Sequence, residues 1–237
     1  EAVGVYATNS TIVTNNSTNT TAVGYGGYGF VLETNSALIN DGGISLNGKG
    51  TAVYSIGANT VTNNTGANIA MAGDNNIGFY MVSRGTVTND ANITGTTGKS
   101  NIGIYNKNGV ITNNGTISVG DSVLAYKSDG TIDFDHSGYA VGIYGEGSQI
   151  NNTGNINIGE NAIGLYTRDN PVKVINRGNI TGVGNGATGI FVDNGEVENA
   201  AGATITMTGD NTIGMVANKN GRIINRGTII MKGDNVT

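Results

Sequence analysis

Short apolar segments recur along this chain in a fixed order, separated by Gly, Asn and Asp. The first segment reads apolar-Gly-apolar-aromatic, as in Ile77-Gly78-Phe79-Tyr80 and Ile102-Gly103-Ile104-Tyr105. The second reads Val or Ile, any residue, then Asn, and the third centres on one Ile such as Ile93. Apolar and polar residues alternate within each segment, which is typical of a β-strand with one buried side. Each unit therefore predicts three short strands.

The length of the repeat can be measured on the Asn of the second segment. Successive members are 25, 23, 26, 24, 39, 24, 23 and 26 residues apart, beginning at Asn15. One unit cannot bury its apolar side alone, but winding each unit into a coil stacks like residues on like at about 4.8 Å. A helical repeat would need two long runs with a period of about 3.6, and none exists. We predict an all-β, right-handed parallel β-helix of about ten coils of 23–26 residues, as a single domain over residues 1–237.

Two columns of this β-helix are expected to be structural. Val87, Ile111, Val174 and their equivalents line a narrow aliphatic interior. The Asn column should lie at a corner, where each side-chain amide bonds to backbone and to the Asn above and below. Asn also tolerates the left-handed conformations that corners demand. The predicted ladder comprises Asn40, Asn63, Asn89, Asn113, Asn152, Asn176, Asn199 and Asn225.

A third column is aromatic and has two interpretations. Each ring follows an inward apolar residue by one step, so alternation points it outward, on the side shared with the small Gly. In one interpretation the rings stack on each other and cover their own sheet. In the other they form a binding stripe for carbohydrate or protein, because exposed rings supply amphipathic contact area. The candidate binding face comprises Tyr54, Tyr80, Tyr105, Tyr126, Tyr144 and Tyr166.

One interval breaks the regularity, and an irregular coil is expected at about 121–140. The interval of 39 residues holds a partial unit in which Phe134 takes the Asn position and no third strand follows. Asp133, Asp135 and His136 crowd there together with Asp129. Their spacing matches neither an EF-hand nor a pair of His on one helix face, so we assign no metal site.

The composition favours strands and argues against nucleic-acid and nucleotide-cofactor binding. Leu numbers only five against 46 Ile and Val together, which favours strands. Charged residues make up 12% of the chain, the net charge is −5, and no Lys/Arg cluster tracks a phosphate backbone, so nucleic acid is not an expected partner. The Gly spacings match no nucleotide-binding fingerprint, and no cofactor or catalytic residue is assigned. Gly233-Asp234-Asn235 repeats Gly73-Asp74-Asn75, so another coil is expected to follow.

Units such as Ile102-Gly103-Ile104-Tyr105 followed by Gly109-Val110-Ile111-Thr112-Asn113 resemble the passenger domains of type V autotransporters. They are most similar to the large fusobacterial surface adhesins of the RadD type. The resemblance covers nearly the whole chain, but its motifs are more specific for fold than for ligand. It implies a rod on the bacterial surface, tethered through a C-terminal outer-membrane β-barrel that is absent here. It also implies attachment to protein or glycan receptors on host cells or other bacteria.

The leading hypothesis is therefore a non-enzymatic adhesin segment, the elongated stalk of an autotransporter. A polysaccharide-cleaving or tailspike-like β-helix enzyme is the first alternative, and it would need long loops that build a cleft with clustered acids and bases. The coil lengths leave little room for such loops. Acids that recur at one corner, among them Asp74, Asp121 and Asp210, fit surface turns better than a catalytic pair. A passive spacer without a ligand is the second alternative.

Overall fold

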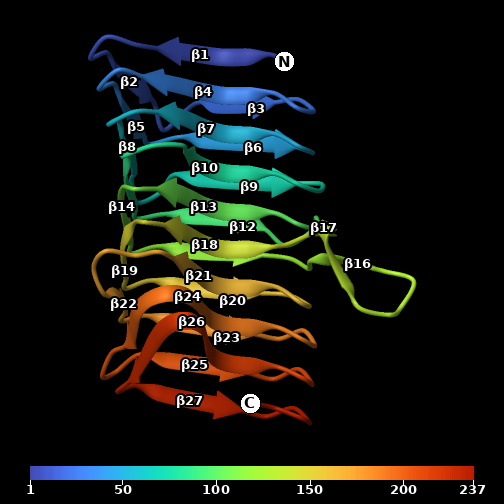
Figure 1. Ribbon diagram of the computed structural model, residues 1–237. Helices are drawn as coiled ribbons and strands as arrows, with labels where there is room; N and C mark the ends of the chain where they lie inside the picture. Colours follow the sequence, from blue (N-terminus) through green and yellow to red (C-terminus); the bar gives the residue numbers. More distant parts are fainter.

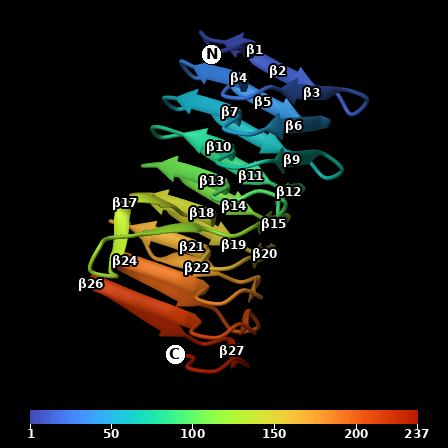
Figure 2. The ribbon, with the colours of Figure 1, turned by 90° about the vertical axis from the view of Figure 1, so that its right-hand side faces the viewer.

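The computed structural model describes all residues 1–237 and confirms the predicted fold. The chain is an all-β, right-handed parallel β-helix and contains no α-helix. Its strands stack as a rod with the two termini at opposite ends (Figures 1 and 2). The structure has no helix with the length and hydropathy needed to cross a membrane. Every sheet of the rod is parallel, so successive strands of one face are joined by a full coil.

Each coil contributes one strand to each of three faces. The first face comprises β1 (Val3–Ala7), β4 (Tyr28–Glu33), β7 (Thr51–Ile56), β10 (Ile77–Met81), β13 (Ile102–Lys107), β18 (Val141–Glu146), β21 (Ile163–Arg168), β24 (Thr188–Asn199) and β26 (Ile213–Asn225). The second comprises β2 (Ile12–Asn15), β5 (Ala37–Asn40), β8 (Thr60–Asn63), β11 (Thr86–Asn89), β14 (Val110–Asn113), β19 (Gln149–Asn152) and β22 (Val174–Asn176). The third comprises β3 (Thr20–Val23), β6 (Gly43–Asn47), β9 (Asn68–Ala72), β12 (Asn92–Gly95), β15 (Thr116–Val119), β20 (Asn155–Ile158), β23 (Asn179–Gly182), β25 (Thr204–Met207) and β27 (Thr228–Met231).

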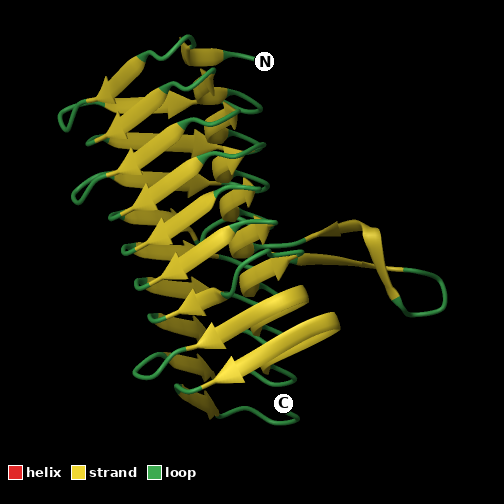
Figure 3. Ribbon diagram, turned by 60° about the vertical axis from the view of Figure 1, so that its left-hand side comes forward, coloured by secondary structure: helices red, strands yellow, loops and turns green.

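The rod has nine coils, close to the predicted number of about ten. The third face is a sheet of nine strands, and the last two coils supply the second face with the C-terminal halves of β24 and β26. These two long strands run past the corner between the first and second faces without a break (Figure 3). The long interval of 39 residues adds no coil, because the chain leaves the rod there.

That excursion is an antiparallel hairpin of β16 (Val123–Tyr126) and β17 (Ile132–Gly138). It projects sideways from the rod between the third and first faces (Figures 1 and 3). Ser122 and Ala140 flank the hairpin and are held together, because the Ala140 amide donates to Ser122 Oγ at 2.9 Å. The hairpin is thus an insertion between two normally stacked coils, and it explains the interval of 39 residues.

The register inside the rod brings equivalent apolar residues together. Val87 pairs with Val61 on one side and Ile111 on the other, while Ile93 pairs with Ile69 and Ile117. These side chains are fully buried in one continuous hydrophobic cluster that runs through the rod. Burying an Ile or Val contributes about 1.5–3 kcal/mol relative to leaving it exposed, so these stacked columns hold the coils together.

The Asn column forms an unbroken chain of side-chain hydrogen bonds. Each Nδ2 donates to the Oδ1 of the Asn in the next coil, at 2.7–2.9 Å, from Asn15 to Asn225. The same Nδ2 of Asn89 or Asn152 also donates to a backbone carbonyl two residues ahead. The amides from Asn40 to Asn199 are completely buried. The ladder therefore satisfies polar groups that the narrow interior would otherwise leave unpaired.

The backbone of this ladder is not left-handed, contrary to the expectation from the sequence. The positive φ angles belong to other corner residues, among them Asn75 at 57°, Asn108 at 54° and Asn211 at 55°. The ladder Asn end extended strands of the second face, and their side chains turn inward. What selects Asn at these positions is the paired donor and acceptor of the amide, not its tolerance of a strained backbone.

Candidate binding face

The outer side of the first face is an apolar strip two residues wide. One column of the strip contains Ile77, Ile102, Val141 and Ile163, and the other contains the aromatic rings. The Gly between them does not share this outer side, which corrects the prediction. A Cβ on Gly78 would lie 2.4 Å from the carbonyl oxygen of Gly103 and 3.3 Å from Ile93, so this Gly faces inward. Two successive residues therefore point into the rod, and simple alternation fails there.

Seven rings stack along this strip with centroids 4.6–5.5 Å apart. Five of the six predicted Tyr belong to this column. The sequence missed Tyr28, whose ring reaches Tyr54 although Val31 occupies the equivalent register position. The column is Tyr28, Tyr54, Tyr80, Tyr105, Tyr144, Tyr166 and Phe191.

Tyr126 does not belong to the column. It lies in β16 of the hairpin, pairs with Ile132 and is 63% exposed. The prediction placed it in the column because the hairpin imitates one unit of the repeat in sequence. Only the antiparallel pairing of β16 with β17 reveals that this segment is not part of the rod.

The rings of the column cover one another's faces. Their planes are inclined by 45–85°, so each ring packs its edge or tilted face on its neighbour. Burial raises the pKa of the Tyr144 and Tyr166 phenols above the ordinary value. Flat ring faces of the kind on which a sugar stacks are thus largely occupied within the column, and the interpretation as a self-covering stack describes the geometry.

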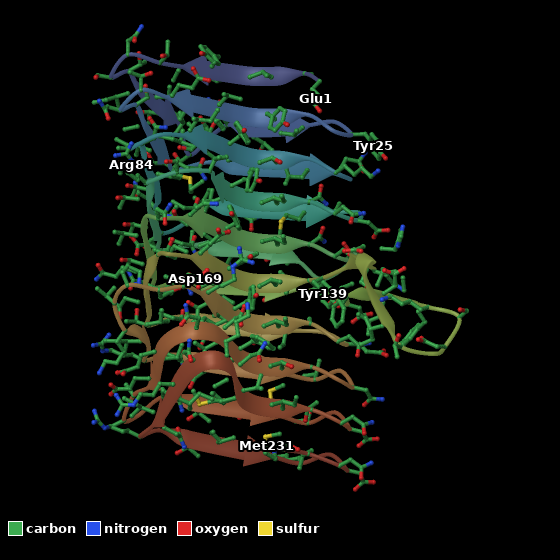
Figure 4. The ribbon with its side chains drawn as sticks, in the orientation of Figure 1. Glu1, Tyr25, Arg84, Tyr139, Asp169 and Met231 are labelled. Atoms are coloured by element: carbon green, nitrogen blue, oxygen red, sulfur yellow. The ribbon has the colours of Figure 1, made fainter.

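The hairpin covers the C-terminal half of the apolar strip. It stands over β18, β21 and β24 and encloses a groove of about 620 Å³ with them. Tyr139 lies at the base of this hairpin, on the opposite edge of the rod from Asp169 (Figure 4). We define the aromatic groove by its lining residues, which are Ile102, Leu124, Ile132, Phe134, Tyr139, Val141, Tyr144, Asn161, Ile163, Tyr166, Gly186, Thr188 and Phe191.

The two walls of the aromatic groove do not close on each other. Phe134 lines the groove from the hairpin side and is still 70% exposed. The hydroxyl of Tyr139 is buried without a hydrogen-bond partner, and burial raises the pKa of this phenol. Apolar surfaces that face each other across solvent are costly, so the groove has the character of a binding site.

The remaining side of the hairpin is polar. His136 Nδ1 lies 2.7 Å from Asp133 Oδ2, and Asp129 bonds to Thr131 within the turn. No group of three or more His, Cys, Asp or Glu in the structure is arranged to hold a metal ion. The corner acids bond to backbone of the next coil, as when Asp74 accepts from the Lys99 amide and Asp121 from the Glu160 amide. These carboxylates are occupied by structural bonds.

Beside the aromatic column lies a row of ion pairs at the ends of the first-face strands. Glu146 contacts Lys107 at 2.9 Å and Arg168 at 3.3 Å, and it accepts a hydrogen bond from Tyr105 at 3.2 Å. The hydrogen bond from Lys107, helped by Arg168, lowers the pKa of the Glu146 carboxyl. Sequence reasoning missed this row, because Lys107, Glu146 and Arg168 are not the same residue type and so do not recur as a visible column.

Residues 95–195 and 185–237 match the sequence family described as the BigA third pectate lyase-like domain. Together the two matches span more than half of the chain. The chain belongs to this family. No curated protein and no solved structure gave a significant match.

The matched part of the BigA third-domain family contains the hairpin and all the strands that build the aromatic groove. The coils before residue 95 lie outside the match but continue the same columns. The words "pectate lyase-like" describe a fold, which is the one seen here. The match fits a β-helix of the autotransporter-passenger kind, and it names neither the type V class nor the fusobacterial adhesins.

Proposed function

We propose that this chain is a surface-exposed attachment domain that binds a receptor in the aromatic groove and performs no chemistry. The observation on which this rests is the single hairpin inserted into a regular rod, which creates an open apolar groove over the aromatic strip. Membership of the BigA third-domain family and the resemblance to autotransporter passengers support a place on a bacterial surface. In this proposal the rod holds the groove away from an outer-membrane anchor, and the receptor belongs to a host cell or another bacterium.

The lining of the aromatic groove supports a binding role over a polysaccharide-cleaving one. Cleavage of a polysaccharide requires acids and bases placed around the scissile bond. None of the residues that line the groove is an Asp, Glu, His, Lys or Arg. The hairpin acids that lie nearby, such as Asp133, are engaged with His136 or with the turn.

The test is an attachment assay with the purified chain coupled to fluorescent beads. We expect beads with the wild-type chain to attach to cultured epithelial cells or to bacteria of other species, and beads with the Leu124→Ser, Ile132→Ser double variant to lose most of that attachment. Ile12→Ser is the matched control, since Ile12 is a 69% exposed apolar residue of the second face. Wild-type beads that attach to neither cell type would overturn the proposal in favour of a passive spacer, and release of reducing sugars from polysaccharides would favour an enzyme.

A further inference from the structure

The hairpin has a defect in its pairing that begins at the aromatic groove, which Phe134 lines, and continues along a separate polar hollow, which Asp135, His136 and Ser137 border. Ala125 pairs with Asp133 and Val123 with Gly138, so the intervening residues Phe134 to Ser137 bulge away from β16. The sheet has only these two strands, and each strand therefore also has one edge without a partner. Side chains fill part of the gap: Ser137 Oγ accepts from the Ala125 amide, and the Asp135 amide donates to Asp133. Unpaired strand backbone of this kind is a template for another strand.

The chemistry of the groove excludes several kinds of occupant. Ring faces in the column are covered by neighbouring rings, so the column offers a sugar no flat platform, and the exposed ring of Phe134 is the one that remains. The side chains that could bond to sugar hydroxyls are few, namely Asn161, Thr188 and the Tyr hydroxyls. A polar polysaccharide would therefore lose hydration without equivalent partners. An occupant with apolar side chains and a hydrogen-bonding backbone fits both walls.

We propose that the aromatic groove binds an extended apolar segment of a partner protein, which adds as a strand along the unpaired edge of β17 at Ile132 to Phe134. Its backbone bonds to the free hairpin backbone, and every second side chain enters the groove between Phe134 and the rings of Tyr144 and Tyr166. The inference rests on the proposed attachment function, for which it names the receptor chemistry as protein rather than glycan. The volume of about 620 Å³ accommodates several such side chains.

The experiment selects peptides from a random ten-residue display library on the intact chain and measures the enriched peptides by fluorescence anisotropy. We expect sequences with apolar residues at alternate positions that bind the Phe134→Ser variant at least tenfold more weakly than the wild type. Phe134 is mostly exposed, so this variant keeps its fold. Val183→Ser is the matched control, because Val183 is also an apolar residue that is 66% exposed, lies outside the groove, and its loss should leave binding unchanged.

N-methylation tests the backbone part of the proposal. An enriched peptide is made in two versions, one with methyl groups on its odd-numbered amides and one with methyl groups on its even-numbered amides. One version should lose binding and the other should keep it, because only alternate amides of an added strand bond to the hairpin. Equal binding of both versions, enriched peptides without alternation, or a glycan array that gives Phe134-dependent signals while the library gives none would overturn the inference. The bead assay separates the two ideas. Attachment that survives Phe134→Ser refutes the inference alone, whereas peptide binding without attachment to any cell refutes the proposed function alone.

Discussion

At the scale of single residues, the rod depends on side chains that satisfy the coil above and below. Asn113 is an example, since it accepts from Asn89, donates to Asn152 and also donates to the carbonyl of Gly115. Its amide is completely buried, so removing the side chain leaves these polar partners unpaired inside the rod.

We expect Asn113→Ala to lower the free energy of unfolding by about 1–3 kcal/mol, because it leaves buried partners unpaired. Urea denaturation followed by circular dichroism measures this change. Asn92→Ala is the control, because Asn92 lies on the outer side of β12 and is exposed. An unchanged midpoint for Asn113→Ala would show that the ladder contributes nothing to stability.

Glycines that lie close to the backbone of the preceding coil give a second prediction at this scale. A Cβ on Gly209 would lie 2.3 Å from the carbonyl oxygen of Gly184, and one on Gly233 would lie 2.1 Å from that of Gly209. Backbone, not a flexible side chain, is the obstacle. Gly209→Ala should therefore destabilise the chain by about 1–3 kcal/mol in the same denaturation experiment. Gly24→Ala, which meets nothing within 4 Å, should be nearly neutral; equal effects of the two changes would contradict the close-approach argument.

At the scale of elements, charge pairs join neighbouring strands on the C-terminal coils. Glu198 of β24 is largely buried and pairs with Lys173 and with Arg226. The hydrogen bond from Lys173 is the main cause that lowers the pKa of Glu198, as the one from Lys107 does for Glu146. These pairs favour one register between neighbouring strands, because a shifted register would separate the opposite charges.

A pH dependence follows from these lowered pKa values. A carboxyl whose pKa is lower in the folded state contributes stability above its unfolded pKa, about 4.3 for Glu, and loses it as the pH falls through the folded pKa. We expect the melting temperature to fall between about pH 5 and pH 3. Melting curves of wild type and Glu198→Gln at several pH values should differ most at neutral pH and converge in acid. A constant difference between them would refute the assignment.

At the scale of the whole molecule, the rod and the hairpin are nearly independent. The chain leaves the rod after Ser122 and returns before Ala140, and these two residues are already hydrogen-bonded to each other. The coils on either side pair in full register, as Ile117 with Ile156 and Tyr105 with Tyr144.

Deleting residues 123–138 should therefore leave the rod folded. We expect an unchanged β-type circular dichroism spectrum and a shift in melting temperature of only a few degrees, in contrast to deletion of β14, which removes part of the core and should unfold the neighbouring coils. Unfolding of the hairpin deletion would show that the insertion is part of the core. If the deletion folds, it also serves as the cleanest groove-free variant for the attachment assay.

The coil could be predicted from the amino-acid sequence, because like residues recur at the interval at which a parallel β-helix must stack them. Columns such as Val87 with Ile111 and Asn89 with Asn113 follow directly from spacing, since this register keeps every apolar residue on the buried side. Alternation alone could not place Gly78, because the strand bends there and turns two successive residues inward. Nor could spacing distinguish Tyr126 from the column, because a hairpin and a coil share the same local pattern. That residues 123–138 leave the rod and face its aromatic strip is visible only in three dimensions, because this arrangement depends on contacts between segments far apart in the chain.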